Sequence, residues 1–354
     1  YQKYAEKGAW PSVPMGKVLK PGRSHSAVPA IRARLLREGY ALDEKPADAK
    51  LIDVQLVSQI TEFQRRHGLH ADGVIGRSTY VALNVTLEQR IAQLHRSMLR
   101  LLALPSNLGD EYVWVNIPAF RMAVMKDNSE ALSMDVIVGK KKHQTPEFSD
   151  VMETLEINPY WNVPTSITRE EILPDLLVSD DYLSRHQMDV LSFHGSSVLD
   201  ANTIDWQEAA TTGVVPFRLR QRPGAKNPLG RVKFLFPNKH AVYMHDTPHP
   251  RLFAKARRAF SHGCIRTENA LLFMGMLAVR YGGQSKEGLQ TIMESRETTP
   301  VGFDHRFPAY ILYFTASPDD NGAIRYYEDI YGRDKPVAKA LATRSTQTSS
   351  VAAR

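Results

Sequence analysis

The sequence predicts an α+β protein of several domains, in which a helical N-terminal part is followed by a mostly β C-terminal part. Apolar residues recur at helical spacing up to about residue 102, whereas from Tyr112 onward they occur in short extended runs between Gly, Pro and Asn turns. With 354 residues, the chain is also too long for one ordinary hydrophobic core and indicates two or three folded units.

Residues 28–84 are expected to form a small three-helix module. Apolar side chains share one face of each of its first two helices, and they are Val28, Ile31, Leu35, Leu56, Ile60 and Phe63. Gly39 follows the first helix as a stop signal, and a last short helix is expected to run to Leu83. Periodicity alone is equally consistent with a bundle that has no binding role.

The segments on either side of this module, residues 1–27 and 85–110, are expected to form a helical scaffold. The stretch 87–102 is strongly amphipathic and is followed by Pro105. Residues 111–334 are expected to form one large, mainly β domain, because β-rich runs alternate with turn residues throughout it. Near its end, "SPDDNG" lies between two such runs and predicts a hairpin.

The β-rich domain is interrupted by a helical insert at about residues 165–212. Thr168 and Glu171 have the spacing of a capping box at the start of this insert. An insert of this length is often a cap over a site, although an inert excursion fits equally well. The last residues, 335–354, contain four basic residues, no acidic ones and many Ser and Thr, which predicts a flexible tail.

Charge and cysteine count argue against several classes of function. The formal net charge is +7, but the densest basic clusters, 140–142 and 257–258, are short and lack the aromatic pattern of RNA-binding proteins, so we expect no nucleic-acid partner. A single cysteine rules out an intrachain disulfide framework and a multi-cysteine zinc site. The histidines also lack zinc-ligand spacing, so we expect no metal and no cofactor.

No run of about 18 apolar residues is present, so nothing within these residues is expected to span a bilayer. The sequence starts at Tyr1 without an initiator Met or a leader pattern. We therefore expect a fragment or a processed form, with any signal or anchor lying upstream.

The single cysteine, Cys264, lies in the polar stretch "SHGCIR". A lone cysteine is more often a small buried hydrophobe, but here Gly263 allows an unusual backbone turn, and two histidines, His245 and His262, could serve as a base. The amides of His262, Gly263 and Cys264 are candidate donors to an oxyanion. Arg266 could lower the thiol pKa or bind a substrate carboxylate.

Strand alternation favours His245 as the base. In "AVYMHD", Tyr243 and His245 fall on one face of the predicted strand. We therefore assign His262 mainly to the oxyanion turn, while a purely structural role for His262 remains an equal alternative.

These motifs resemble a known family. "HDT" at 245–247 followed by "SHGCIR" at 261–266 is similar to the signature of the L,D-transpeptidases with a YkuD-type catalytic domain. Further stretches, among them "VNIPAF", "INPYWNVP" and "NPLGRVKF", resemble the large Gram-negative, YcbB-like members. "FQRRHGL" and "DGVIGRST" resemble a peptidoglycan-binding module. The likeness extends from about residue 10 to 334.

The resemblance implies a cysteine acyltransferase that forms 3→3 cross-links between meso-diaminopimelate residues of peptidoglycan. Cys264 would attack a donor tetrapeptide stem, D-Ala would leave, and an amine of an acceptor stem would resolve the thioacyl-enzyme. His245 would shuttle protons and the backbone carbonyl of Asp246 would orient its ring. Amides of the turn, at His262, Gly263 and Cys264, would stabilise the tetrahedral intermediates.

The resemblance also suggests residues around the substrate. Trp161, Tyr160 and Tyr243 would line the donor pocket, although each could be plain core. Arg266 would bind a stem carboxylate or form a structural ion pair, and Asn269 would hold the turn after the motif. Carbapenems are expected to acylate Cys264.

Three alternatives stay open: an L,D-carboxypeptidase using the same cysteine, an enzyme attaching lipoprotein to peptidoglycan, and a non-catalytic wall-binding protein. We expect peptidoglycan stems as partners, with other wall-synthesis proteins as further candidates. The expected location is the periplasm, with an inner-membrane anchor possible upstream.

Overall fold

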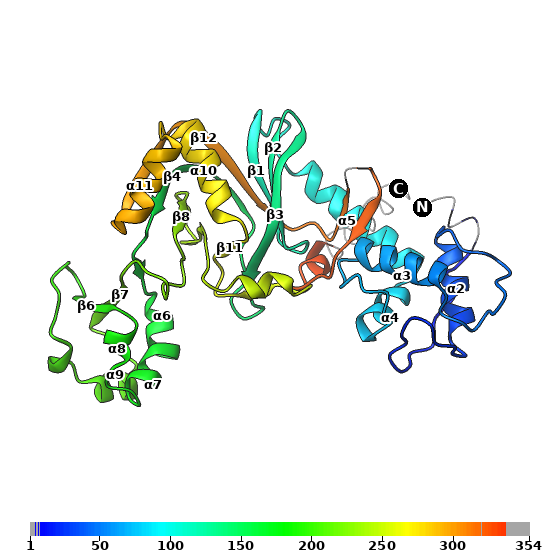
Figure 1. Ribbon diagram of the computed structural model, residues 1–354, viewed down its shortest axis with the longest axis horizontal. Helices are drawn as coiled ribbons and strands as arrows, with labels where there is room; N and C mark the ends of the chain where they lie inside the picture. Colours follow the sequence, from blue (N-terminus) through cyan, green and yellow to red (C-terminus); the bar gives the residue numbers. More distant parts are fainter. Residues whose placement is uncertain (1–3, 5, 7, 320, 338–354) are drawn as a thin grey trace, which may run out of the picture.

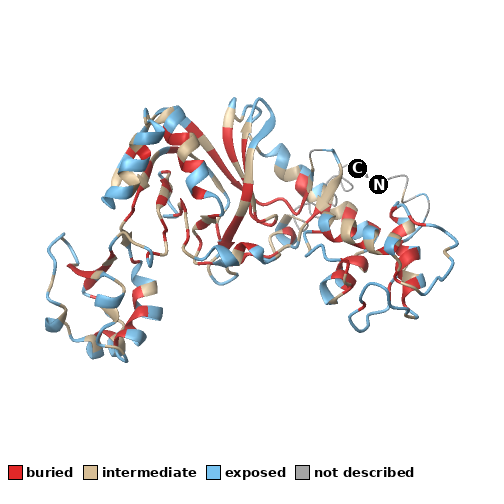
Figure 2. Cartoon of the chain, in the orientation of Figure 1, coloured by how far each residue is buried: buried red, intermediate tan, exposed pale blue. Residues whose placement is uncertain are grey.

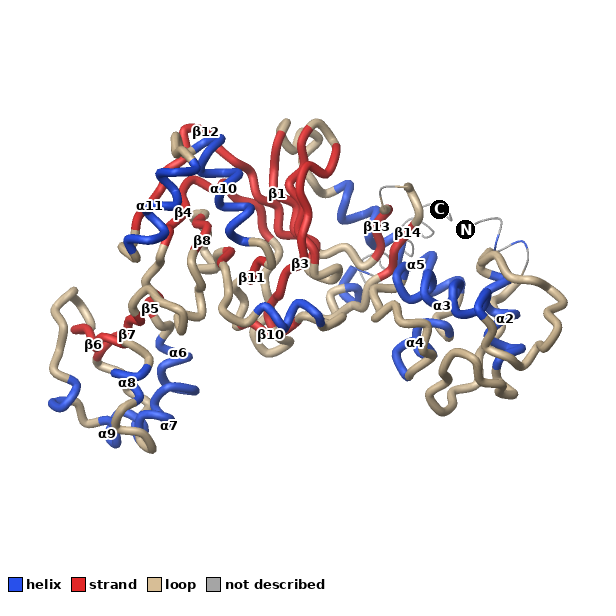
Figure 3. Tube along the Cα trace, viewed as in Figure 1, coloured by secondary structure: helices blue, strands red, loops and turns tan. Residues whose placement is uncertain are grey.

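The computed structural model describes residues 4, 6, 8–319 and 321–337. A β-rich domain occupies the middle of an elongated molecule, with the helical module at one end and a small cap at the other (Figure 1). Helices gather at the two ends and around the central sheet (Figure 3). The predicted fold class, a helical N-terminal region followed by a mostly β domain, is confirmed. In the described residues we find no helix with the length and apolar character needed to span a membrane.

The N-terminal module contains the three predicted helices, α2 (Val28–Arg37), α3 (Val54–Arg66) and α4 (Arg77–Leu83). The apolar residues that predicted the first two helices are all fully buried and form one core. Asp53 caps α3, since its side chain accepts a hydrogen bond from the Leu56 amide at 2.8 Å.

Residues 8–27 differ from the helical scaffold that we expected there, because they contain no helix. They run along the module, where Leu19 forms a β-bridge with Ile75 and the side chain of Asn84 binds both backbone groups of Val13. Three prolines in this stretch explain the difference, since proline interrupts helical hydrogen bonding.

Helix α5 (Leu87–Leu102) joins the module to the β-rich domain. Its Gln93 side chain donates hydrogen bonds to the carbonyls of Thr315 at 2.7 Å and Tyr327 at 2.9 Å. Asp334 accepts from Arg100 at 2.6 Å in the same region. These contacts attach α5 to the predicted hairpin, which is present as β13 (Ala316–Pro318) and β14 (Ile324–Tyr326).

Nine strands form the main sheet, in the spatial order β10-β3-β11-β9-β8-β4-β12-β1-β2. Because β2 also pairs with β3, eight of these strands close into a ring. Their bounds are β1 (Glu111–Asn116), β2 (Arg121–Lys126), β3 (Ser129–Gly139), β4 (Phe148–Ile157), β8 (Val232–Leu235), β9 (Met244–His245), β10 (Ala259–Ser261), β11 (Ile265–Thr267) and β12 (Thr299–Leu312).

The core of this domain lies between the sheet and two helices, α10 (Ala270–Tyr281) and α11 (Lys286–Ser295). Phe273 of α10 packs on Phe234 of β8 with ring centroids 4.6 Å apart. A short 3-10 helix, η3 (Pro250–Ala254), lies between β9 and β10. Buried residues line the strands of the sheet, and separate buried groups lie in the module and the cap (Figure 2).

The predicted helical insert is a small domain with its own hydrophobic core, and it is more mixed than expected. A three-stranded sheet in the order β5-β7-β6 extends the unit from Trp161 to Gln221, beyond the predicted 165–212. Its elements are β5 (Trp161–Asn162), α6 (Thr165–Ile167), the π-helix η1 (Thr168–Ile172), α7 (Leu173–Leu176), α8 (Tyr182–Arg185), β6 (Met188–Ser192), η2 (Ala201–Thr203), α9 (Trp206–Thr212) and β7 (Phe217–Gln221). We call this unit, residues 161–221, the cap.

The capping box that we expected at Thr168 and Glu171 does not form. The Thr168 hydroxyl donates to the carbonyl of Pro164 at 3.3 Å, and the Glu171 carboxylate contacts His262 of another element. In the predicted tail, residues 335–337 continue a helical turn, and 338–354 lie outside the described residues.

Candidate active site

The predicted nucleophile and base lie on neighbouring strands of the main sheet. Strands β9 and β11 run parallel, with His245 opposite Arg266. Because side chains alternate along a strand, Tyr243 and His245 face the same side as Cys264 and Arg266. The residues between them are fully buried in the opposite, apolar face of the sheet. The sheet therefore presents these four side chains together.

The ring of His245 is held in one tautomer. Its Nδ1 lies 2.5 Å from the backbone carbonyl oxygen of Asp246. A carbonyl oxygen only accepts hydrogen bonds, so Nδ1 carries the proton and Nε2 keeps its lone pair. Burial, aided by the positive charge of Arg266, lowers the pKa of His245 from 6.5 to about 3. His245 is therefore neutral at pH 7 and able to accept a proton.

Asp246 is itself fixed by the neighbouring strand. Its amide donates to the carbonyl of Val232 at 3.0 Å, and its Oδ2 accepts from the Arg231 amide at 2.8 Å. Gly230 leaves room for this carboxylate, because a Cβ there would lie 2.2 Å from Oδ2. Sequence reasoning did not identify this clamp, and the pair of residues 230 and 231 just before β8 carries no local sign of it.

The thiol of Cys264 is partly buried beside Tyr243. Burial raises the pKa of Cys264, while hydrogen bonds from the backbone N–H and the hydroxyl of Tyr243 act in the opposite direction. Burial also raises the pKa of Tyr243, so its hydroxyl stays a donor at neutral pH. The resting site consequently holds a neutral thiol and a neutral imidazole rather than an ion pair.

Lys233 is a further member of this face that sequence reasoning missed. It lies opposite His245 on β8, and its Nζ lies 4.7 Å from the centre of the Tyr243 ring. Glu156 on β4 balances its charge at 3.6 Å. The neutral His245 thus lies between two cations, Lys233 on β8 and Arg266 on β11.

The turn that carries Cys264 is held by two hydroxyls. Gly263 has φ +117°, a conformation that favours glycine. Its amide donates to Ser261 Oγ at 3.1 Å, and its carbonyl accepts from Thr145 Oγ at 2.8 Å. Ser261 Oγ also donates to the Cys264 carbonyl at 2.5 Å.

This arrangement corrects one expectation about the oxyanion donors. We expected the Gly263 amide to point at the reacting carbonyl, whereas it is occupied by Ser261 because the turn folds back on that hydroxyl. In the part of the chain that the structure describes, the amides of His262 and Cys264 have no acceptor. These two amides remain the candidate donors.

The ring of His262 contacts the cap rather than the thiol-bearing face. Its Nε2 lies 2.7 Å from Glu171 Oε1 and 3.1 Å from Lys140 Nζ. Burial lowers the pKa of His262, and Glu171 acts in the opposite direction. The side chain of His262 therefore connects the turn to η1, as Glu171 is part of that helix.

The structure does not bring every predicted substrate residue to this face. The Tyr160 ring stacks under the Arg220 guanidinium at 4.4 Å, and Trp161 packs against the core of the cap. Asn269 is exposed, directly precedes α10 and makes no side-chain cap bond. Arg266, in contrast, lies on the thiol face, and among the described residues its buried Nε has no hydrogen-bond partner.

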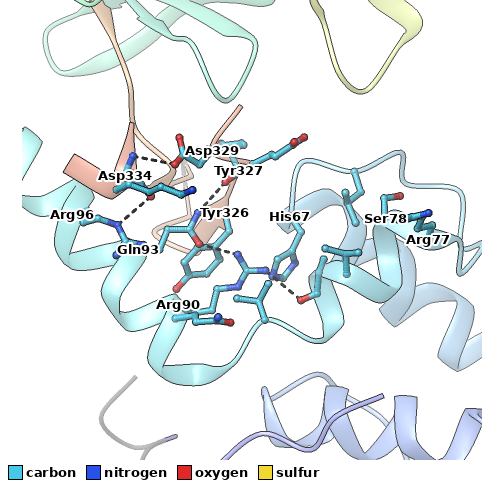
Figure 4. A pocket seen from close by; sticks show the side chains of 17 residues that line it. His67, Arg77, Ser78, Arg90, Gln93, Arg96, Tyr326, Tyr327, Asp329 and Asp334 are labelled. Atoms are coloured by element: carbon cyan, nitrogen blue, oxygen red, sulfur yellow. Dashed lines mark hydrogen bonds and ion pairs between the residues drawn. The ribbon is translucent and has the colours of Figure 1, made fainter. Parts of the chain in front are cut away.

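A large cavity lies away from Cys264. It measures about 920 Å³ and lies between the module and the end of the β-rich domain. Arg90, Gln93 and Arg96 of α5 point into it, with Tyr326 and Asp334 opposite (Figure 4). In the described ranges, no cluster of three His, Cys, Asp or Glu side chains could hold a metal ion.

Comparison with protein families identifies the β-rich domain. Residues 110–300 match the L,D-transpeptidase catalytic domain, known as YkuD. The chain belongs to the L,D-transpeptidase family. Cys264 and His245 both lie within the matched domain. Residues 24–83 match the "Putative peptidoglycan binding domain", which coincides with the three-helix module.

Individual relatives agree with this assignment. A Haemophilus influenzae protein described as "Putative L,D-transpeptidase" is 32% identical over 225 residues, which cover 64% of this chain and 45% of the relative. This L,D-transpeptidase thus spans about half the length of that curated relative.

Solved L,D-transpeptidase structures are more distant. The one from Xylanimonas cellulosilytica is 14% identical, covers 84% of this chain and 99% of its own, and has a TM-score of 0.26. The E. faecium catalytic domain acylated by ertapenem is 15% identical, with coverages of 58% and 100% and a TM-score of 0.28.

Proposed function

We propose that this enzyme forms 3→3 cross-links between diaminopimelate residues of peptidoglycan stems through a thioacyl intermediate on Cys264. The observation that carries the proposal is the neutral His245, which is held with Nε2 unprotonated on the same face as the thiol. A neutral base beside a neutral thiol suits a nucleophile that is deprotonated only as it attacks.

In the first half-reaction, Cys264 Sγ attacks the carbonyl that joins diaminopimelate to the terminal D-Ala. His245 Nε2 takes the thiol proton, and the amides of His262 and Cys264 stabilise the oxyanion. The C–N bond then breaks, the imidazolium gives its proton to the departing amine, and free D-Ala leaves a thioester.

In the second half-reaction, the side-chain amine of an acceptor diaminopimelate attacks the thioester. His245 removes a proton from this amine and returns it to the departing thiolate, which restores the resting site. Arg266 supports this substrate class, because it places a largely buried cation with an unused donor on the thiol face. Stem peptides carry the carboxylates that such a cation binds.

Mass spectrometry of products from purified tetrapeptide muropeptides tests the proposal. We expect dimers with a diaminopimelate-to-diaminopimelate bond from the wild type and none from Cys264→Ala. Tripeptide monomers without dimers would replace the proposal with a carboxypeptidase, in which water resolves the thioester. If an added lipoprotein lysine is joined instead, the acceptor assignment is wrong.

We also propose that carbapenems acylate Cys264 and that the module binds peptidoglycan in the periplasm. Ring opening of the β-lactam by Cys264 uses the same thiol, base and oxyanion donors as the first half-reaction. Intact-mass measurement should show one adduct, absent from Cys264→Ala. Co-sedimentation with purified sacculi tests the module, and cell fractionation tests the location.

A further inference from the structure

The cap and the thiol-bearing turn are joined by a small set of charged contacts. Two successive acidic residues of η1 make them: Glu171 contacts His262 at 2.7 Å, and Glu170 contacts Lys142 at 3.2 Å. Lys140 completes the set at 4.0 Å from Glu171. Residues 140–142 follow β3, so the cap meets both the end of that strand and the turn.

The contact of Glu171 with His262 has a defined hydrogen-bond direction. A carboxylate only accepts, so His262 Nε2 carries the hydrogen and donates it. The Lys140 ammonium, 3.1 Å from the same nitrogen, cannot donate there and instead balances the charge of Glu171. His262 is therefore oriented by a charge-assisted hydrogen bond from outside its own domain.

The orientation of His262 matters because its amide is one of the two unoccupied donors of the turn. The other peptide groups of the turn are held from inside, by the hydroxyls of Ser261 and Thr145 and by the Lys140 amide, which donates to the Ser261 carbonyl at 2.9 Å. The ring of His262 supplies the anchor on the outer side. Without Glu171, this side of the turn loses its hydrogen-bond acceptor.

We propose that Glu171 is a positioning residue for acyl transfer: the cap, through Glu171, holds His262 and so aligns the oxyanion donors. The inference rests on the proposed role of Cys264. Glu171 touches neither the substrate nor the thiol. Its side chain is half-exposed, as are those of Lys140 and Glu170, and such pairs are individually weak.

Carbapenem acylation of Cys264, followed by stopped-flow absorbance and intact mass, tests this in the full chain. Glu171→Ala should lower the maximal acylation rate about tenfold, because the variant loses the charge-assisted hydrogen bond that aligns the oxyanion donors. The half-saturating carbapenem concentration should change little, because Glu171 does not contact the ligand. Glu171→Gln keeps an acceptor oxygen and should restore most of the rate. Glu170→Ala, on the same helix, should stay within about twofold of wild type, because its partner Lys142 is exposed and is not part of the thiol-bearing turn.

Equal losses of acylation rate in Glu170→Ala and Glu171→Ala would overturn the proposal, since a general loosening of the cap would then explain both variants. An unchanged rate in Glu171→Ala would also overturn it. If that variant does not fold, Glu171→Lys provides the same comparison and should lower the rate further, because it faces Lys140. A wild type that forms no adduct would overturn the role of Cys264 itself, and mass spectrometry separates that outcome from a slow but complete reaction.

Discussion

Gly230 lies against Asp246 so closely that a Cβ on the glycine would be 2.2 Å from Oδ2 of the aspartate. The Asp246 carbonyl in turn fixes the ring of His245. A residue without chemistry of its own thereby controls the orientation of the proposed base.

Gly230→Ala should lower activity and stability together. Its φ is +63°, and the collision must push the Asp246 side chain off the Arg231 amide. We expect a loss of about 1–3 kcal/mol in unfolding free energy, and at least about a tenfold loss in carbapenem acylation rate. Gly283→Ala is the control, because Gly283 has φ +61° and nothing within 4 Å of a Cβ. Equal acylation rates in the two variants would contradict the role of Gly230.

The two hydroxyls that hold the thiol-bearing turn should be individually important. Ser261→Ala leaves the buried amide of Gly263 without its acceptor, and Thr145→Val removes the donor to the Gly263 carbonyl. Each should cost about 1–3 kcal/mol of unfolding free energy and should slow acylation. Thr211→Val, which removes an exposed hydroxyl from the cap helix α9, is the control and should leave acylation unchanged. Chemical denaturation and acylation kinetics measure both effects.

The acylation rate of Cys264 should not fall as the pH drops through 6.5, so its pH profile should have no acid limb there. Because burial and Arg266 lower the pKa of His245 to about 3, the base stays unprotonated throughout the neutral and mildly acidic range. Lys233 also lowers this pKa, but less than Arg266 does. Arg266→Gln removes the stronger of these two charges, so it should move the acid limb toward neutral pH. The pH profile of the acylation rate measures this, and a wild-type limb centred at 6.5 would show that His245 is not buried as described.

The same shift in the pKa of His245 should make the fold less stable in acid. The unfolded imidazole takes up a proton below pH 6.5, whereas the folded one does so only near 3, so protons favour the unfolded state between these values. This group should reduce the unfolding free energy by up to about 1.4 kcal/mol per pH unit in that window. His245→Asn should have a correspondingly shallower dependence in urea titrations. Parallel curves would argue against the shift.

Attachment of α5 to the β-rich domain should depend on Asp334. Its carboxylate contacts Arg96 at 3.2 Å, Arg100 at 2.6 Å and the Thr315 hydroxyl at 2.8 Å. Asp334→Ala leaves two mostly buried cations uncompensated and should cost about 3 kcal/mol.

The control for Asp334→Ala is Glu328→Ala. The exposed ion pair of Glu328 with Arg257 should contribute less than about 0.5 kcal/mol to the unfolding free energy. Equal denaturation midpoints for the two variants would show that the Asp334 network does not hold the two parts together.

The sequence was most informative where a local pattern decides the structure. Ile31, Leu56 and Phe63 predicted the module because each helix buries one apolar face. In the cap, strands as short as β5 contain too few residues to show a period, and only helices were expected there. At the site, Cys264 and His245 were predicted from their motif.

Residues that act through long-range contacts could not be predicted in this way. Glu171 fits a local capping box, but its carboxylate binds His262, far away in the sequence. Gly230 and Thr145 likewise owe their roles to contacts that form only when distant strands and turns meet. The occupied amide of Gly263 depends on the folded turn, so the residue was identified while its role was not.

The closed ring of strands also protects the chemistry against slippage. A shift of β9 by one residue along β11 would turn His245 into the apolar core and expose Met244 in its place, because neighbouring side chains face opposite sides. In an open sheet such a slip disturbs a single edge, whereas here β9 is bonded to β8 and β11, and the ring continues on both sides. Alignment of base and nucleophile is therefore a property of the whole topology, enforced by strands that never touch the substrate.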